Sequence, residues 1–262
     1  MGKPKKSKTA ERGIKKESWI GLREKIKNAI QEALFPWAFV CLDCGKELGD
    51  EDRTHSLCPE CRKNLPYITG TRCRYCGEPI EQKYDVCKHC QTARPYFDKA
   101  YAPFAYEGVI KKIILSYKDG NANYLYKFIA KFITDYYNAL DLRCDAVCYV
   151  PSSKAKILRR GFEHNKKVTE IISKDTRNQL IYPLKVVKNM KDQTRKNRSQ
   201  RLEDIKGVFA PAKGFDRMFT WGKTILLIDD VVTTGATAGE CARVLKEELG
   251  AATVIVLALA RA

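Results

Sequence analysis

The chain has 262 residues, enough for one ordinary domain and a small companion, and its 44% hydrophobic content excludes a wholly disordered protein. No apolar run reaches the ~18 residues of a membrane span, and the basic N-terminus lacks the apolar core of a secretory signal. We therefore expect a cytoplasmic protein without a membrane span. The formal net charge of +17 favours polyanionic partners, such as nucleic acid or phosphorylated metabolites.

The texture of the sequence divides the chain into four expected segments. Residues 1–18 are rich in lysine and predict a disordered basic arm. Apolar residues then recur at three- and four-residue steps over 19–36, which predicts an amphipathic helix. Residues 37–94 contain short turns, glycines and paired cysteines, and such a stretch cannot build its own core. Residues 95–262 have the composition of an ordinary globular domain.

Expected strands and helices alternate through this last segment, which predicts an α/β fold with a mainly parallel sheet and helices on both faces. Ligands in such sheets bind beyond the carboxyl ends of the strands. A polar basic loop and a short helix are expected over 190–205. The expected strands cover 101–106, 146–150, 181–187, 224–229 and 253–259. The expected helices cover 108–117, 123–140, 163–174 and 238–249.

Eight cysteines form four C-x-x-C pairs. The two-residue gap lets one tight turn present both sulfurs to a single ion, and two such turns complete a tetrahedral four-thiolate zinc site. Two sites with no open coordination position should be structural or serve as a platform for partners. Sequential pairing closes short loops, so it is favoured over the interleaved alternative. The predicted ligands are Cys41, Cys44, Cys58 and Cys61 for one ion, and Cys73, Cys76, Cys87 and Cys90 for the other.

Other interpretations of these residues stay open. A disulfide framework is disfavoured in a chain without a secretory signal, and a redox role for one pair fits four tandem pairs less well than zinc does. His55 and His89 lie among the pairs, and either could replace a thiolate. The remaining cysteines, Cys144, Cys148 and Cys241, are expected to be ordinary core residues.

An apolar run from Ile225 to Ile228 ends in two adjacent acids, Asp229 and Asp230. Buried charges need partners, so we expect these carboxylates to face a ligand. The small-residue turn that follows carries hydroxyls and precedes a helix, and its backbone N–H groups suit a phosphate dianion. Acceptors for sugar hydroxyls and a phosphate cradle therefore lie one turn apart. The predicted cradle comprises Thr233, Thr234, Gly235, Ala236 and Thr237.

The segment around these acids, ILLIDDVVTTGAT, resembles the phosphoribosyl pyrophosphate (PRPP) motif of type I phosphoribosyltransferases. This resemblance implies that Asp229 and Asp230 hold the ribose 2′ and 3′ hydroxyls and that the 233–237 turn wraps the 5′-phosphate. A second stretch, VPSSKAKILRRGFEHN, resembles the ComF (competence-protein) family, with Glu163 and His164 where that family has Asn and Gln. The chain thus resembles a family in which a double zinc ribbon precedes a phosphoribosyltransferase-like domain.

Hydroxyl and cationic side chains are candidates for the pyrophosphate of PRPP. The basic loop 188–201 suits a hood that orders over a bound polyanion, although a solvated charged loop has the same composition. Mg²⁺ bound with PRPP would neutralise the departing pyrophosphate. The candidate residues are Ser152, Ser153, Lys154, Lys118, Arg160 and Arg201.

Two functions remain open from the sequence. One is an enzyme that transfers phosphoribosyl groups or hydrolyses PRPP. Its acceptor is unidentified, because the sequence offers no clear general acid or base for one. His164 is the only histidine outside the zinc region, lies on an expected helix and is interpreted as incidental. The other is a non-catalytic adaptor for single-stranded DNA, or a PRPP sensor. For this adaptor the family resemblance implies a DNA-uptake helicase or other competence proteins as partners. A zinc-ribbon transcription regulator is less favoured, because no base-reading element is evident.

Overall fold

The computed structural model describes most of the two cysteine-rich segments and the α/β domain. The described residues are 39–53, 56–119, 122, 124–188 and 203–262. The expected basic arm, the helix over 19–36, His55, Arg201 and nearly all of the basic loop lie outside them. Within the described part of the chain, no helix has both the length and the apolar composition needed to cross a membrane.

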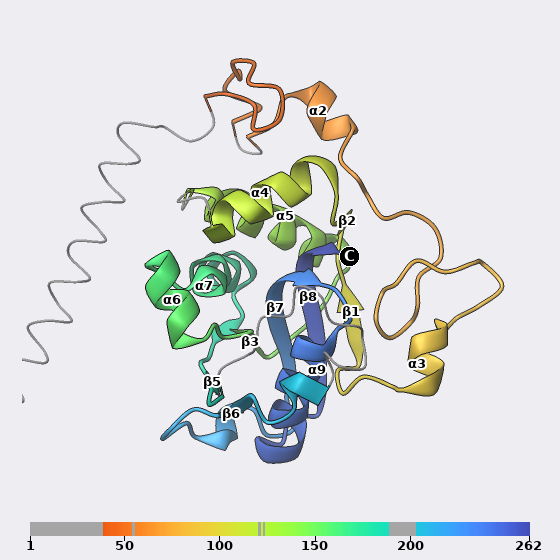
Figure 1. Cartoon of the computed structure of the whole chain (residues 1–262), viewed down its shortest axis with the longest axis vertical. Helices are drawn as coiled ribbons and strands as arrows, with labels where there is room; N and C mark the ends of the chain where they lie inside the picture. Colours follow the sequence, from red (N-terminus) through yellow and green to blue (C-terminus); the bar gives the residue numbers. More distant parts are fainter. Residues whose placement is uncertain (1–38, 54–55, 120–121, 123, 189–202) are drawn as a thin grey trace, which may run out of the picture.

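A parallel sheet forms the centre of the domain (Figure 1). Its strand order is β1-β8-β7-β3-β4, β2 also pairs with β8, and every pair in this sheet is parallel. The long strands β7 and β8 lie in the middle, so the segment with the two adjacent acids belongs to the best-supported part of the sheet. The strands are β1 Lys99–Tyr101, β2 Phe104–Ala105, β3 Ala146–Tyr149, β4 Gln179–Leu180, β7 Thr224–Val232 and β8 Thr253–Arg261.

Helices cover both faces of this sheet. Successive residues of a strand point to opposite sides, so neighbouring residues of β7 pack against different helices. Leu226 and Ile228 pack with residues of α4, α5 and α7, whereas Ile225 and Leu227 pack with residues of α9. The predicted fold class is confirmed. The helices are α2 Pro59–Lys63, α3 Lys88–Thr92, α4 Gly108–Asp119, α5 Leu125–Ala139, α6 Lys154–Arg160, α7 His164–Thr176 and α9 Ala236–Arg243; α9 continues into the π-helical turn η2 Val244–Glu248, and η1 Arg217–Phe219 is a 3₁₀ turn.

Two expected strands are each divided in the structure at a proline, which has no N–H to donate to a sheet. The run over 101–106 is divided around Pro103 into β1 and β2. The run over 181–187 is wrong as a single strand, because β4 ends before Pro183 and β5 (Leu184–Val186) begins after it. β5 leaves the main sheet and pairs antiparallel with β6 (Phe209–Pro211).

The helix α6 is not expected from the sequence, because its seven residues carry four cations and no clear apolar period. Its first turn is capped by Ser153, whose hydroxyl accepts from the N–H of Lys156 at 3.4 Å. It ends at Gly161, which has a φ of 79°. α6 therefore follows the turn after β3 directly and presents its cations near that edge of the sheet.

The core packing of β7 makes one testable prediction. Leu227 is fully buried, with an exposure of 0%, so Leu227→Ala should lower the free energy of unfolding by about 3 kcal/mol through lost contacts and a residual cavity. Urea denaturation of the zinc-loaded protein measures this change. Leu158→Ala is the matched control, because Leu158 is 83% exposed and its loss should change stability by less than about 0.5 kcal/mol. Equal effects of the two substitutions would contradict this packing.

Candidate functional site

The turn after β3 and the last residues of β7 meet at the same edge of the sheet. The two strands are parallel neighbours with Tyr149 opposite Ile228, and the N–H of Val150 donates to the carbonyl of Ile228 at 2.9 Å. β7 continues to Val232, so the expected strand end at 229 is three residues early. The extension is supported by continued pairing with β8.

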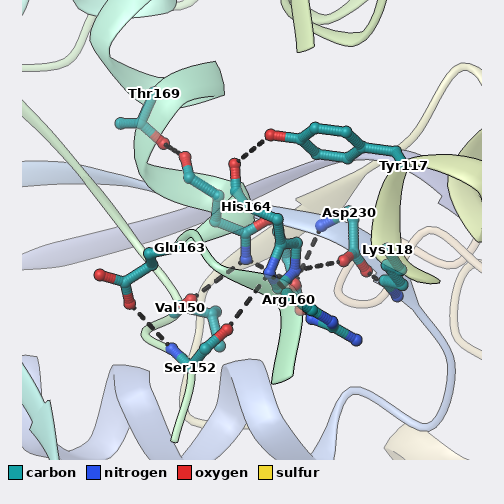
Figure 2. Close-up of polar contacts among 11 residues, drawn as sticks. Tyr117, Lys118, Val150, Ser152, Arg160, Glu163, His164, Thr169 and Asp230 are labelled. Atoms are coloured by element: carbon teal, nitrogen blue, oxygen red, sulfur yellow. Dashed lines mark hydrogen bonds and ion pairs between the residues drawn. The ribbon is translucent and has the colours of Figure 1, made fainter. Parts of the chain in front are cut away.

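Asp230 is a buried carboxylate held between two cationic or hydrogen-bonding side chains (Figure 2). Its side chain is 7% exposed; Oδ1 accepts from Lys118 Nζ at 2.7 Å, and Oδ2 accepts from His164 Nε2 at 2.7 Å. Burial alone would raise the pKa of Asp230, but Lys118 and His164 outweigh it and hold the pKa below the ordinary value. Asp230 is therefore ionised at neutral pH.

His164 occupies the centre of this network. Its Nδ1 lies 3.2 Å from Ser152 Oγ and 3.1 Å from Arg160 Nη1, both of which can donate to it. A neutral imidazole with its proton on Nε2 satisfies these contacts together with the bond to Asp230. His164 is therefore not isolated on its helix, as an incidental residue would be, but is a buried member of this network. The backbone of His164 is also held in place, because the hydroxyl of Tyr117 donates to its carbonyl at 2.6 Å.

Asp229 lies beside Asp230 in a different environment. Asn165 Nδ2 donates to the carbonyl of Val150 at 3.1 Å and to Asp229 Oδ1 at 3.3 Å, which ties the first turn of α7 to both strands. Burial, followed by the negative charge of Asp230, raises the pKa of Asp229 to about 7. The two adjacent acids thus differ in protonation near neutral pH.

Glu163 fixes the turn that follows β3. Its Oε1 accepts from the N–H of Ser152 at 3.0 Å, and its Oε2 accepts from the hydroxyl of Tyr149 at 3.0 Å. Glu163, His164 and Asn165 were not among the predicted site residues. The available signal was their place directly after an Arg-Gly-Phe turn in the stretch that resembles the ComF family.

The structure brings some of the predicted pyrophosphate-binding residues together. Ser152, Arg160 and Lys118 all lie in the network around His164 and Asp230 (Figure 2). Ser153 is 5% exposed and caps α6, while Lys154 is exposed on the first turn of α6. Arg201 is outside the described residues.

The turn over 233–237 leads from β7 into α9. Gly235 is the N-cap residue of α9 with a φ of 75°, and the hydroxyl of Thr234 accepts from the N–H of Ala236 at 3.3 Å. Thr233 is exposed. A cavity of about 800 Å³ lies between this turn and the second cysteine cluster. Residues of the turn line this cavity, whereas Asp229 and Asp230 do not.

The eight paired cysteines form two compact clusters, grouped sequentially as favoured from their spacing. Within each cluster the four sulfurs lie within 4.8 Å of one another. The Sγ atoms are 3.8 Å apart in one inter-pair contact of the first cluster and 3.7 Å apart in one of the second. A tetrahedron with Zn–S bonds of about 2.3 Å has S···S edges of about 3.8 Å. The donor set and its spacing therefore fit zinc.

The two clusters share one local construction. Gly45 and Gly77 both have positive φ values, 73° and 70°, and their N–H groups donate at 2.9 Å to the carbonyls of Cys41 and Cys73. A short helix follows the third cysteine of each set, α2 in one and α3 in the other. His89 is outside both four-sulfur sets; its Nδ1 lies 3.6 Å from Glu78 Oε2.

Two four-cysteine zinc sites ahead of a parallel α/β domain define the class of this protein. Residues 30–91 match the family model for the double zinc ribbon domain. The chain is 26% identical to competence protein ComFC of Bacillus subtilis, covering 85% of this chain and 95% of that protein, and 26% identical to competence protein F of Haemophilus influenzae, covering 86% and 97%. The predicted resemblance to the ComF family is thus confirmed.

One solved structure, described as the allosteric regulatory enzyme of purine biosynthesis, is similar over 50% of this chain. The aligned region spans 26% of that chain, with 16% sequence identity and a TM-score of 0.32. At this score the similarity supports no inference about fold or function.

The buried pair of Lys118 and Asp230 predicts a measurable coupling. Lys118→Met should lower the free energy of unfolding by about 3 kcal/mol, because it leaves a buried carboxylate without its cation. In an Asp230→Asn background the same substitution should cost less, with a coupling energy of about 1–3 kcal/mol. Urea denaturation of the four proteins measures the cycle.

Lys131→Met is the control for this cycle, because Lys131 pairs with Asp135 on the helix surface and is 39% exposed. Its cost should stay below about 0.5 kcal/mol. Additive effects of Lys118→Met and Asp230→Asn would show that the two side chains do not interact as described.

Proposed function

We propose that this protein binds PRPP at the carboxyl edge of β3 and β7 and acts there as a phosphoribosyltransferase or PRPP hydrolase, in a role linked to natural competence and DNA uptake. The observation that carries the proposal is the position of Asp229 and Asp230, two residues before the turn that leads into α9 and beside the turn after β3. The names of the two curated relatives support the link to competence.

In this proposal the two carboxylates bind the ribose. An ionised carboxylate offers about four lone-pair sites, so Asp230 can accept from a ribose hydroxyl while it keeps Lys118 and His164. Asp229 accepts from the neighbouring hydroxyl. The 5′-phosphate lies against the backbone N–H groups of the 233–237 turn, where the N-terminus of α9 favours negative charge.

The pyrophosphate end faces the turn after β3. During transfer, the bond between the ribose anomeric carbon and the pyrophosphate oxygen breaks, and an acceptor atom or a water oxygen forms the new bond to that carbon. Pyrophosphate leaves with the bonding electron pair. Arg160 and Lys154 supply positive charge to it, and Ser152 offers a hydroxyl. With water as acceptor, the attacking water loses a proton to solvent, and the products are ribose 5-phosphate and pyrophosphate.

Mg²⁺ is the cofactor proposed with PRPP. The carboxylates of Asp229 and Asp230 are hard oxygen donors of the kind that Mg²⁺ takes, so the donor set fits. When bound with PRPP, Mg²⁺ supplies charge neutralisation for the pyrophosphate oxygens. The chain's own contribution is to orient the ribose through the two acids and to keep Asp230 ionised through Lys118 and His164.

Calorimetric titration with PRPP and Mg²⁺ tests this proposal. Asp229→Asn should weaken binding at pH 8 by at least about tenfold, because an amide is a poorer acceptor for a ribose hydroxyl than a carboxylate. The pKa of Asp229 in the free protein is about 7, so wild-type binding that needs the ionised form should weaken by about tenfold per pH unit below 7. This component of the pH dependence should be absent in Asp229→Asn.

PRPP itself titrates, so the decisive quantity is the difference in pH dependence between the two proteins. Asp175→Asn is the matched control, because it makes the same change in charge at an exposed position of α7. It should bind PRPP as the wild type does at every pH. PRPP binding that is absent in the wild type, or unaffected by Asp229→Asn, would refute the assignment.

A second function, an adaptor that binds single-stranded DNA, is favoured by a specific observation on α6. This helix carries Lys154, Lys156, Arg159 and Arg160 and no acidic residue, and the whole chain has a net charge of +17. Positive surfaces bind nucleic-acid backbones through phosphate neutralisation. In this role the protein would meet a DNA-uptake helicase or other competence proteins at the incoming strand.

Fluorescence anisotropy with a labelled oligothymidylate tests the adaptor function. The affinity should fall with salt, and the double variant Lys154→Ala/Arg159→Ala should reduce the slope of log K against log salt by about 1.4, or about 0.7 per contact. Lys185→Ala/Lys213→Ala removes the same number of exposed charges elsewhere and should leave the slope nearer to the wild type. Lack of affinity at low salt would count against this function.

A further inference from the structure

The first zinc ribbon, around Cys41–Cys61, lies beyond α4, and the second, around Cys73–Cys90, lies beside β1 (Figure 1). The two ribbons belong to different core clusters. Cys41 and Cys58 of the first ribbon share a core cluster with residues of α4 and α5. All four cysteines of the second ribbon share the other cluster with Phe97, Val232 and Ala236. The second ribbon is therefore part of the same packed unit as the 233–237 turn, and the first is not.

Arg261, the last residue of β8, connects the second zinc site to the sheet. Its side chain is 5% exposed; Nη1 donates to the carbonyl of Cys76 at 2.7 Å, and Nη2 lies 3.5 Å from both Cys76 Sγ and Glu78 Oε2. A buried guanidinium needs compensating negative charge. Four thiolates around one Zn²⁺ carry a net charge of about −2, which supplies it.

The backbone of Arg261 also meets the start of the turn. Arg261 pairs in register with Val232, and the N–H of Ala262 donates to the carbonyl of Val232 at 3.0 Å. Thr233 follows Val232 directly. Arg261 therefore contacts a zinc ligand through its side chain, while its pairing with Val232 and the N–H of the next residue hold the base of the turn.

Two close contacts, at Gly77 and Gly235, lie on either side of this connection. A Cβ atom on Gly77 would lie 2.5 Å from the carbonyl oxygen of Ala100, so the second ribbon approaches β1 at backbone contact. A Cβ atom on Gly235 would lie 3.3 Å from Phe97 Cζ, in the linker between the ribbon and β1. The rest of the space between the second ribbon and the turn is the 800 Å³ cavity, so Arg261 and these two contacts are the direct links between them.

We propose that the second zinc site, acting through Arg261, positions the 233–237 turn, whereas the first zinc site does not. Arg261 is a positioning residue in this account. If the turn binds the 5′-phosphate, a step that rests on the function proposed above, then zinc occupancy of the second site and anion binding are coupled. By linkage, each raises the affinity of the other by the same factor.

Amide hydrogen exchange of the turn and the first half of α9 tests the positioning role without any ligand. Cys90→Ser in the second site should speed exchange over 233–240 by about tenfold or more, because the turn loses its support. Cys44→Ser makes the same change in the first site and should leave exchange there within about twofold of the wild type. Amide exchange over 233–240 that is equally fast in the two variants, or equally slow, would overturn the proposal.

Arg261 variants provide the second test, in case Cys90→Ser unfolds the ribbon. Arg261→Met should lose one of two zinc ions at a chelator concentration that leaves the wild type loaded, and should speed exchange of the turn. Arg261→Lys keeps the charge and should restore zinc retention. Its rate of amide exchange over the turn should lie between those of the wild type and Arg261→Met. Arg62→Met, in the first ribbon beside Cys61, should leave exchange of the turn unchanged. An Arg261→Met protein with both zinc ions and a protected turn would overturn the proposal.

PRPP titration separates the two proposals. If the wild type binds PRPP, then Cys90→Ser should weaken binding by about fivefold or more, a coupling of ordinary size, while Cys44→Ser should not. If the wild type does not bind PRPP, the proposed function fails. The exchange and zinc-retention results still decide whether Arg261 and the second zinc site hold the turn.

Discussion

A buried negative charge at the carboxyl edge of the sheet is the constraint on which the site depends. The carboxylate of Asp230 is stable there because Lys118 reaches it from the end of α4 and His164 from the start of α7, over 112 and 66 residues of sequence. Each partner fixes the end of its helix at this edge. The network around the two acids therefore also determines how α4 and α7 are placed on their face of the sheet.

Much of the fold follows from local rules and could be predicted from the sequence. The four longest helices have clear periodicity, and the C-x-x-C pairs define their zinc sites within short loops. The predicted strands and helices differ from the structure where a single residue overrides the hydrophobic pattern around it. Pro103 and Pro183 divide apolar runs that read as continuous strands, and α6 depends on a cap and a Gly161 terminus more than on periodicity.

The candidate site was only partly predictable, for a different reason. Ser152 could be selected because a hydroxyl after a strand end suits a polyanion, and Lys118 and Arg160 because they are cations. The contact between His164 and Asp230 could not be predicted, because the sequence around a histidine on a helix does not indicate which distant carboxylate it meets. Its neighbour Glu163 was noted as a departure from the ComF pattern, yet only the geometry shows that it holds the turn after β3.

The two zinc ribbons show how similar local chemistry acquires different consequences. Gly45 and Gly77 adopt the same positive φ because each knuckle must turn tightly around its ion. At Gly45 an added Cβ atom would meet nothing within 4 Å, whereas at Gly77 it would collide with the backbone of β1. Spacing of the cysteines thus determines that an ion binds, and the packing around the knuckle determines what the ion holds in place. In the second ribbon that packing includes Arg261, a buried arginine from the last strand of the sheet. Arg261 also pairs with Val232, so the zinc site is linked directly to the base of the turn after β7.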